Sequence, residues 1–137
     1  MSTVEFIPSG FKVLGVSSHV AMGRAMEIML KAVGFGTVKI ILPKDVCAQA
    51  TEINPDFIMF TPEYLKSTMQ EKVALGCPCK TRSFCQGAQI VMLLKAPEGE
   101  SVLSSKEMGF DTIVFANSSL DKMYDAFERA YLHHQRI

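Results

Sequence analysis

Short apolar runs alternate along most of this chain with longer segments of helical periodicity. The runs begin at Lys12, Val38, Asp56, Gln89 and Thr112, and they read KVLGVS, VKIIL, DFIMF, QIVMLL and TIVF. These runs are largely apolar and do not alternate with polar residues, which is typical of strands buried on both faces. Strands that alternate with helices predict a parallel sheet covered by helices on both sides.

The segments between these runs carry helix signals. The first holds apolar residues at the spacing of one helix face, followed by Gly34 where a helix would end: Met22, Ala25, Met26, Met29, Leu30 and Val33. Further helices are expected over 44–53, from Thr61-Pro62 to about Leu75, over 101–108, and from about Ser119. This order favours an α/β flavodoxin-like doubly wound sandwich with a five-stranded parallel sheet of order 2-1-3-4-5.

Length and composition restrict the class of protein further. The chain has 137 residues, of which 48% are hydrophobic and 20% charged, as expected for one globular domain. We expect an N-terminal arm over 1–10 and the domain over 11–137. Fourteen basic residues balance fourteen acidic ones, which argues against a nucleic-acid binder. Neither a membrane-spanning run nor a signal-peptide pattern is evident, so we expect a cytoplasmic protein with reduced cysteines.

Three stretches of the chain resemble parts of a bacterial response-regulator receiver domain. VLGVSSHVAMGRAMEIMLKAVGF is similar to the first strand, acidic turn and first helix of a receiver. NPDFIMF is similar to the strand that leads to its phosphoacceptor, and VMLLKAPEGESVLSSKEMGFDTIVFANSSLDKM to its last third. The resemblance extends from about Phe11 to Tyr131, and it implies the same fold and a role in two-component signal transduction.

The residues that perform phosphoryl transfer in a receiver domain are replaced in this chain. A receiver holds Mg²⁺ with two acids after strand 1, phosphorylates an aspartate after strand 3, and uses a hydroxyl and a lysine after strands 4 and 5. Here those positions hold Ser17 and Ser18, Thr61, Leu94 and Ala116. Mg²⁺ requires carboxylate ligands, and a threonine cannot form an acyl phosphate. These residues therefore predict a degenerate acceptor pocket that lacks Mg²⁺ and any other cofactor.

We therefore interpret the chain as a phosphorylation-independent pseudo-receiver, not an enzyme, that signals through protein–protein interaction. In receivers, the face formed by helix 4, strand 5 and helix 5 docks downstream partners or a second copy. Its exposed candidates in this sequence are Lys106, Asp121, Lys122, Asp125 and Arg129. A protein partner, with a homodimer as one option, is the expected ligand, and neither nucleic acid nor a membrane is.

Two alternatives remain open. Cys77, Cys79 and Cys85 could form a metal or redox sensor, with His133 and His134 as further ligands, although Cys77-Pro-Cys79 is shorter than a usual zinc spacing. Free thiols in a loop are the plainer interpretation. The degenerate acceptor pocket could instead bind a small molecule, because the loss of charge makes it more apolar. We interpret His19 as a cap or loop residue, since no nucleophile–base pair is evident.

Overall fold

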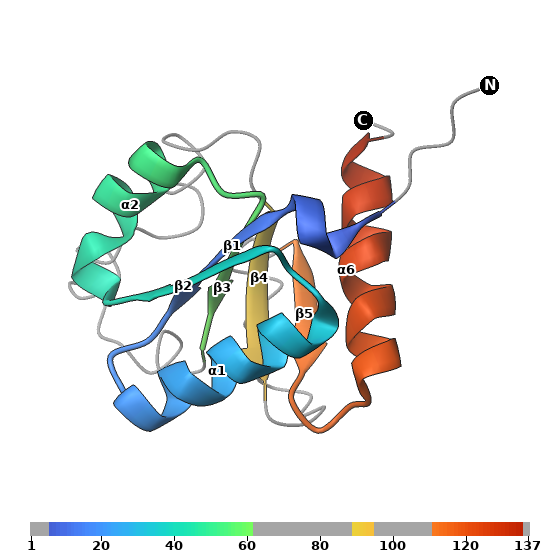
Figure 1. The fold of residues 1–137 in the computed structure, drawn as a ribbon, viewed down its shortest axis with the longest axis horizontal. Coiled ribbons are helices and arrows are strands. Elements are labelled where there is room, and N and C mark those ends of the chain that lie inside the picture. Colours follow the sequence, from blue (N-terminus) through green and yellow to red (C-terminus); the bar gives the residue numbers. More distant parts are fainter. Residues whose placement is uncertain (1–5, 62–88, 95–110, 136–137) are drawn as a thin grey trace.

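The fold is built on one parallel sheet. The computed structural model describes residues 6–61, 89–94 and 111–135. Its strands are β1 (Lys12–Val16), β2 (Thr37–Ile41), β3 (Phe57–Phe60), β4 (Gln89–Leu94) and β5 (Thr112–Phe115). They lie in the order β2-β1-β3-β4-β5 with all four pairings parallel (Figure 1). The predicted flavodoxin-like α/β fold and its strand order are confirmed.

Helices cover both faces of the sheet. One face packs on α1 (Val20–Val33) and α6 (Leu120–Gln135), around a core that includes Met26, Leu30 and Phe127. The other face packs on α2 (Val46–Ile53), which follows the short 3-10 helix η2 (Pro43–Asp45). Figure 1 shows α1 and α6 together at one side of the strands and α2 at the far end of β2. The described helices thus form the outer layers expected of a doubly wound sheet.

The helix ends follow the signals in the sequence. Gly34 ends α1 in the left-handed conformation, with φ of 116°, and its N–H donates to the carbonyls of Leu30 and Lys31. A side chain there would be strained, which explains why glycine stands at this position. Ser119 precedes α6, and its hydroxyl accepts a hydrogen bond of 3.3 Å from the N–H of Lys122. The predicted end of α1 and the predicted start of α6 are therefore confirmed.

The core face of α1 is narrower than its apolar pattern suggested. Met26 and Leu30 are buried as expected, and Gly23 joins them. A Cβ on Gly23 would lie 3.0 Å from Cγ2 of Ile40, so the helix packs closely on β2. Met22 and Ala25 were expected on the same face as Met26 and Leu30. Met22 is 41% exposed and Ala25 is exposed as well, so both expectations are wrong. The buried row is turned toward β2, which α1 approaches closely at Gly23.

The described part of the N-terminal segment lies against the domain. Residues 8–10 form a 3-10 helix, η1 (Pro8–Gly10), and the Pro8 carbonyl accepts an N–H from Gly36 at 3.2 Å. Phe6 is 4% exposed and stacks on Phe11 with ring centroids 5.2 Å apart. Its carbonyl accepts a hydrogen bond of 2.9 Å from the Tyr124 hydroxyl. Residues 6–10 were expected to belong to an arm, but they contribute a side chain to the core.

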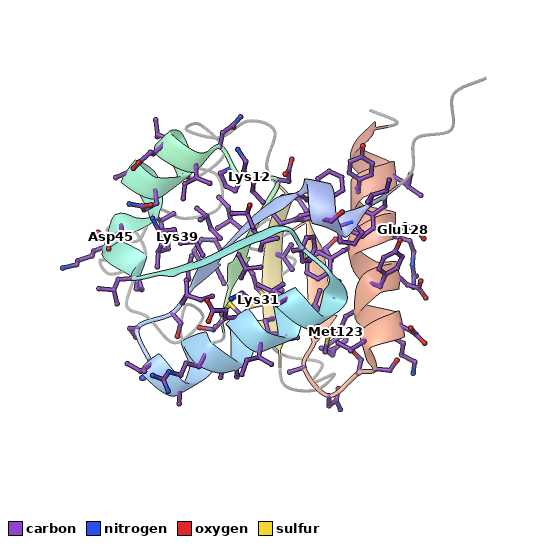
Figure 2. All side chains as sticks on the ribbon, in the orientation of Figure 1. Lys12, Lys31, Lys39, Asp45, Met123 and Glu128 are labelled. Carbon is purple, nitrogen blue, oxygen red and sulfur yellow. The ribbon has the colours of Figure 1, made fainter. Side chains whose placement is uncertain are left out.

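Figure 2 places Met123 between α1 and α6, where it belongs to the larger of the two core clusters.

The helices predicted over 62–75 and 101–108 lie outside the described residues, as does the loop that carries Cys77, Cys79 and Cys85.

Candidate functional site

The carboxyl ends of the strands bring most of the predicted acceptor residues to one edge of the sheet. Val16, the last residue of β1, is the register partner of Phe60, the last residue of β3. Ser17 and Thr61, the next residues along the chain, therefore lie side by side just beyond the ends of these two neighbouring strands. Leu94 ends β4 and pairs with Phe115, and Ala116 comes next along the chain. In open α/β sheets this edge is where ligands bind.

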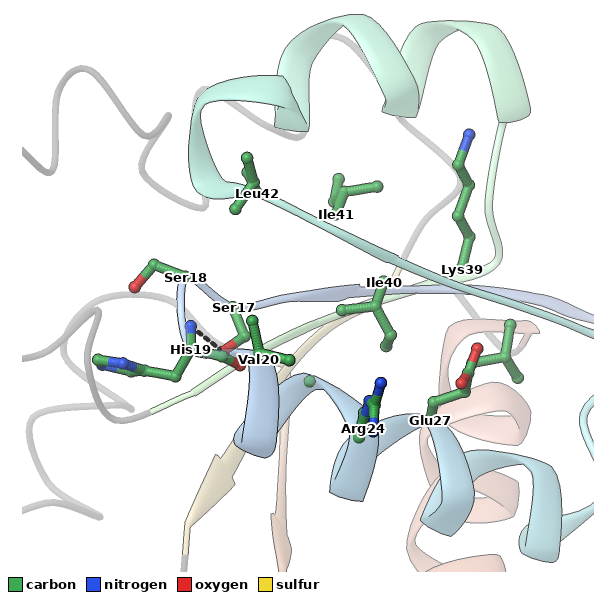
Figure 3. A pocket seen from close by; sticks show the side chains of 12 residues that line it. Ser17, Ser18, His19, Val20, Arg24, Glu27, Lys39, Ile40, Ile41 and Leu42 are labelled. Atoms are coloured by element: carbon green, nitrogen blue, oxygen red, sulfur yellow. Dashed lines mark hydrogen bonds between the residues drawn. The ribbon is translucent and has the colours of Figure 1, made fainter.

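The Ser17 side chain is engaged by its own backbone. Ser17 is 4% exposed, and its hydroxyl oxygen accepts a hydrogen bond of 3.1 Å from the N–H of His19. The same hydroxyl donates to the His19 carbonyl at 3.2 Å (Figure 3). Serine commonly forms such local turns, because its short hydroxyl reaches the backbone two residues on. Here the turn sets the entry of the chain into α1, and His19 is the N-cap residue, as expected.

Thr61 is also buried, at 2% exposure, whereas Ser18 and Ala116 are exposed. Within the described residues, every buried side-chain nitrogen or oxygen has a hydrogen-bond partner. The two buried hydroxyls, Ser17 and Thr61, are therefore already satisfied by the protein. This is the pattern of groups that hold a turn and a strand end in place, because a buried polar group without a partner would be costly.

The donor set at this edge does not fit Mg²⁺. Ser17, Ser18 and Thr61 offer hydroxyls, which carry no negative charge, whereas Mg²⁺ is bound through carboxylates in octahedral geometry. Across residues 6–61, 89–94 and 111–135, no group of three or more His, Cys, Asp or Glu side chains is placed to hold a metal ion. Glu63, the acid nearest to this edge in the sequence, lies outside these ranges.

A groove runs from this edge along the contact between α1 and β2, with a cavity volume of about 420 Å³ (Figure 3). It is lined by residues of the β1–α1 turn, α1 and β2: Ser17, Ser18, His19, Val20, Gly23, Arg24, Glu27, Val38, Lys39, Ile40, Ile41 and Leu42. Two predicted pocket residues, Ser17 and Ser18, are among them, whereas Thr61 and Ala116 are not. The groove was not predicted, because it arises from the packing of Gly23 against Ile40. Gly23 in the middle of a helical pattern is the only sequence signal that could have indicated it.

Several residues singled out in the sequence cannot be placed at this site. The cysteine loop and Lys106 lie outside the described residues, and nothing is described of the side chains of His133 and His134. The interpretation of the cysteines as a metal or redox sensor therefore stays a prediction.

In the described part of the chain, no helix is both long enough and apolar enough to span a membrane.

Comparison with known proteins rests on structure. No family model matches the chain, and no curated protein matches its sequence. Among solved structures, a pilus assembly-related protein of Burkholderia pseudomallei covers 96% of both chains with a TM-score of 0.72 and 13% identity.

Two further structures are described as a signal receiver domain and as a chemotaxis protein. The signal receiver domain of a modulated diguanylate cyclase from Desulfovibrio desulfuricans covers 92% of this chain and 97% of its own, with a TM-score of 0.69 and 13% identity. The chemotaxis protein CheY4 of Vibrio cholerae covers 88% and 98%, with a TM-score of 0.65 and 16% identity. The structural neighbours are CheY-like response-regulator receiver domains, and the chain has their fold. The resemblance seen in the sequence is confirmed at this level.

Proposed function

We propose that this chain is a phosphorylation-independent pseudo-receiver, a non-catalytic cytoplasmic signalling module that acts through contact with another protein. Its receiver fold supports the class, because the neighbours include a chemotaxis protein and the receiver domain of a signalling enzyme. One observation supports the proposed loss of phosphorylation. Where a receiver would need carboxylates, this chain has the buried hydroxyls of Ser17 and Thr61 at the ends of adjacent strands.

The charge of a phosphoryl group explains why this observation supports the proposal. A phosphoryl group brings negative charge, which requires a divalent cation or cationic side chains to balance it. The described residues at the edge supply neither, since Ala116 stands after β5 and Ser17 is turned onto its own backbone. A receiver scaffold with such an edge can still present fixed surfaces to a partner.

The proposed partner face combines β5 and α6 with the helix predicted over 101–108. Of its candidate residues, Lys122 and Arg129 are exposed on one row of α6, and Asp121 and Asp125 on the next. β5 is an edge strand of the sheet, so the face is open on that side in the described structure. Mixed charge over a fixed helix and strand suits a specific protein contact.

The experiment is incubation of the full chain with acetyl phosphate and Mg²⁺, followed by intact mass spectrometry under conditions that preserve acyl phosphates. We expect the mass to stay that of the unmodified chain. A variant that restores the receiver's acids and lysine, Ser17→Asp, Ser18→Asp, Thr61→Asp and Ala116→Lys, serves as the positive control for the scaffold. A phosphoryl adduct on the natural chain would overturn the proposal.

The groove gives one observation in favour of a second candidate function, the binding of a small molecule. Its walls carry the apolar side chains of Val20, Ile40 and Leu42, and it reaches the hydroxyls of Ser17 and Ser18. Arg24, Glu27 and Lys39 also line it, so it offers charged groups as well as apolar walls. Ligand sites combine apolar walls with polar groups that fix the orientation of the ligand. Hydrogen exchange of the chain with and without a metabolite extract tests this: protection confined to the β1–α1 turn and β2 would support it, and unchanged exchange would exclude it for that extract.

A further inference from the structure

The outward surface of α1 is unusual for a helix on the surface of a soluble domain. Its buried row holds Gly23, Met26 and Leu30. The row on the opposite side faces solvent but is also apolar: Ala21, Ala25, Ile28 and Ala32. Ile28, at the centre of this row, is 69% exposed. A surface helix normally turns polar residues outward, so a second apolar row indicates a surface that is covered in the functional state.

Three charged residues, two basic and one acidic, border this apolar row. Arg24 and Lys31 are both exposed and lie on the adjacent row of α1. Arg24 also lines the groove between α1 and β2. Glu27 lies between the two basic residues and forms an ion pair with Lys31 at 3.6 Å. Within the described residues Arg24 has no ion-pair partner. The surface that fits α1 therefore combines apolar contact with carboxylates along one edge.

One outward row of α6 in the same chain is acidic. Asp121, Asp125 and Glu128 recur at the spacing of one helix row and point away from the buried row of Met123, Phe127 and Ala130. α6 packs on the same face of the sheet as α1, and the two helices are in contact. Figure 2 shows Lys31 on α1 and Glu128 on the outer side of α6. One face of the molecule thus holds α1, with its apolar row and the exposed Arg24 and Lys31, beside the acidic outward row of α6. The next row of α6 carries the exposed Lys122 and Arg129.

We propose that a second copy of this chain covers this face. A two-fold axis that runs between α1 and α6 would bring α1 of each copy over α6 of the other. Both contacts of the resulting pair are then the same, as a two-fold interface requires, and each joins a cationic row to an acidic one. Both helices must take part, because a standard interface buries roughly 800 Å² per partner, more than one short helix provides.

This dimer would be one form of the protein–protein contact proposed above. It shares Asp121 and Asp125 of α6 with the proposed partner face, but it adds α1, which is no part of that face. It does not depend on the loss of the phosphoryl switch. Failure of the dimer would therefore leave the phosphorylation result unaffected, and a phosphorylated chain could still dimerise.

The test is sedimentation-velocity ultracentrifugation of the full chain over a range of concentrations. The natural chain is expected to form a concentration-dependent dimer that weakens as salt rises, because the Debye length falls from roughly 30 Å at about 0.01 M to roughly 3 Å at about 1 M. Two charge-reversed variants, Arg24→Glu with Lys31→Glu and Asp121→Lys with Asp125→Lys, are each expected to be monomeric. All four positions are exposed, and circular dichroism checks that both variants fold.

Mixing the two variants gives the sharpest result. Each α1–α6 contact in the mixed pair again joins opposite charges, so the mixture is expected to recover the dimer that neither variant forms alone. Lys44→Glu, an exposed reversal on η2, is the matched control and is expected to leave the dimer unchanged. A natural chain that stays monomeric at every concentration would overturn the proposal. Dimers that persist in both variants, or a mixture that stays monomeric, would do so as well.

Discussion

The two edges of the sheet differ in what their side chains do. At the amino-terminal edge, rings from five segments of the chain pack together: Phe6, Phe11, Phe35, Phe57, Tyr124, Phe127 and Tyr131, with centroids of neighbouring rings 4.9–6.3 Å apart. At the carboxyl edge stand small residues, Ser17, Ser18, Thr61 and Ala116. The aromatic side chains at the first edge stabilise the fold by packing against one another. The second contributes little to the core, and it is the edge where a receiver would carry its charged groups.

Phe57→Ala should have the largest effect on stability. Phe57 is 1% exposed and packs against Phe6, Phe11, Phe35 and Phe127. We expect a loss of about 3–5 kcal/mol in the free energy of unfolding, because the truncation removes buried area and leaves a cavity. Urea unfolding followed by circular dichroism measures it. Thr61→Ala at the opposite edge should cost far less, and an equal loss at both positions would remove the contrast between the edges.

Phe6→Ala tests whether the N-terminal segment belongs to the core. We expect a loss of about 3 kcal/mol, at the lower end for a buried aromatic residue because Phe6 lies near the chain terminus. Tyr124→Phe, which removes only the hydroxyl that donates to the Phe6 carbonyl, should cost about 1 kcal/mol. The same unfolding measurement compares the two. A loss below about 0.5 kcal/mol for Phe6→Ala, the level of an ordinary surface change, would show that residues 6–10 are an arm after all.

Gly36→Ala should disturb the N-terminal segment where η1 packs against the start of β2. A Cβ on Gly36 would lie 2.0 Å from the backbone oxygen of Ser9, so η1 must move to accommodate it. We expect a loss of about 1–3 kcal/mol, the usual range for overpacking. Gly10→Ala is the matched control, since a Cβ there meets nothing within 4 Å. Equal unfolding midpoints for the two variants would contradict the packing described for η1.

Ser17→Ala should have the smallest of these effects. It removes the two hydrogen bonds to the His19 backbone, for which we expect about 1 kcal/mol. Ser18→Ala, at the exposed neighbouring position, should stay within about 0.5 kcal/mol of the natural chain. Chemical denaturation of both variants side by side checks the difference. Identical stability would mean that the Ser17 turn does not help to hold the start of α1.

The strands were predictable from the sequence because burial on both faces produces continuous apolar runs. The ranges for β4 and β5 agree with the prediction, and those of the other strands differ by a residue or so at an end. Phe6 was not predictable as a core residue, since a single aromatic side chain before a Pro-Ser-Gly sequence carries no periodicity. Its burial depends on Phe35 and Tyr124, which lie far away along the chain.

The edge residues were predictable in their positions but not in their environments. The ends of apolar runs placed Ser17 and Thr61 at the same edge, and the register confirms that placement. The Ser17 hydroxyl forms hydrogen bonds with the backbone of His19. These bonds depend on the turn into α1, which the residue types alone do not specify. The groove beside α1 likewise depends on how closely Gly23 approaches Ile40.

The central claim, that the carboxyl edge has lost the receiver's metal chemistry, is tested most directly by a Mg²⁺ titration followed by amide NMR. The amides of Ser17, Ser18, His19 and Thr61 report on this edge, and the variant with Ser17→Asp, Ser18→Asp and Thr61→Asp serves as the control that restores carboxylates. The account predicts no saturable shift of these amides in the natural chain at millimolar Mg²⁺. Saturable shifts confined to these amides in the natural chain would contradict it.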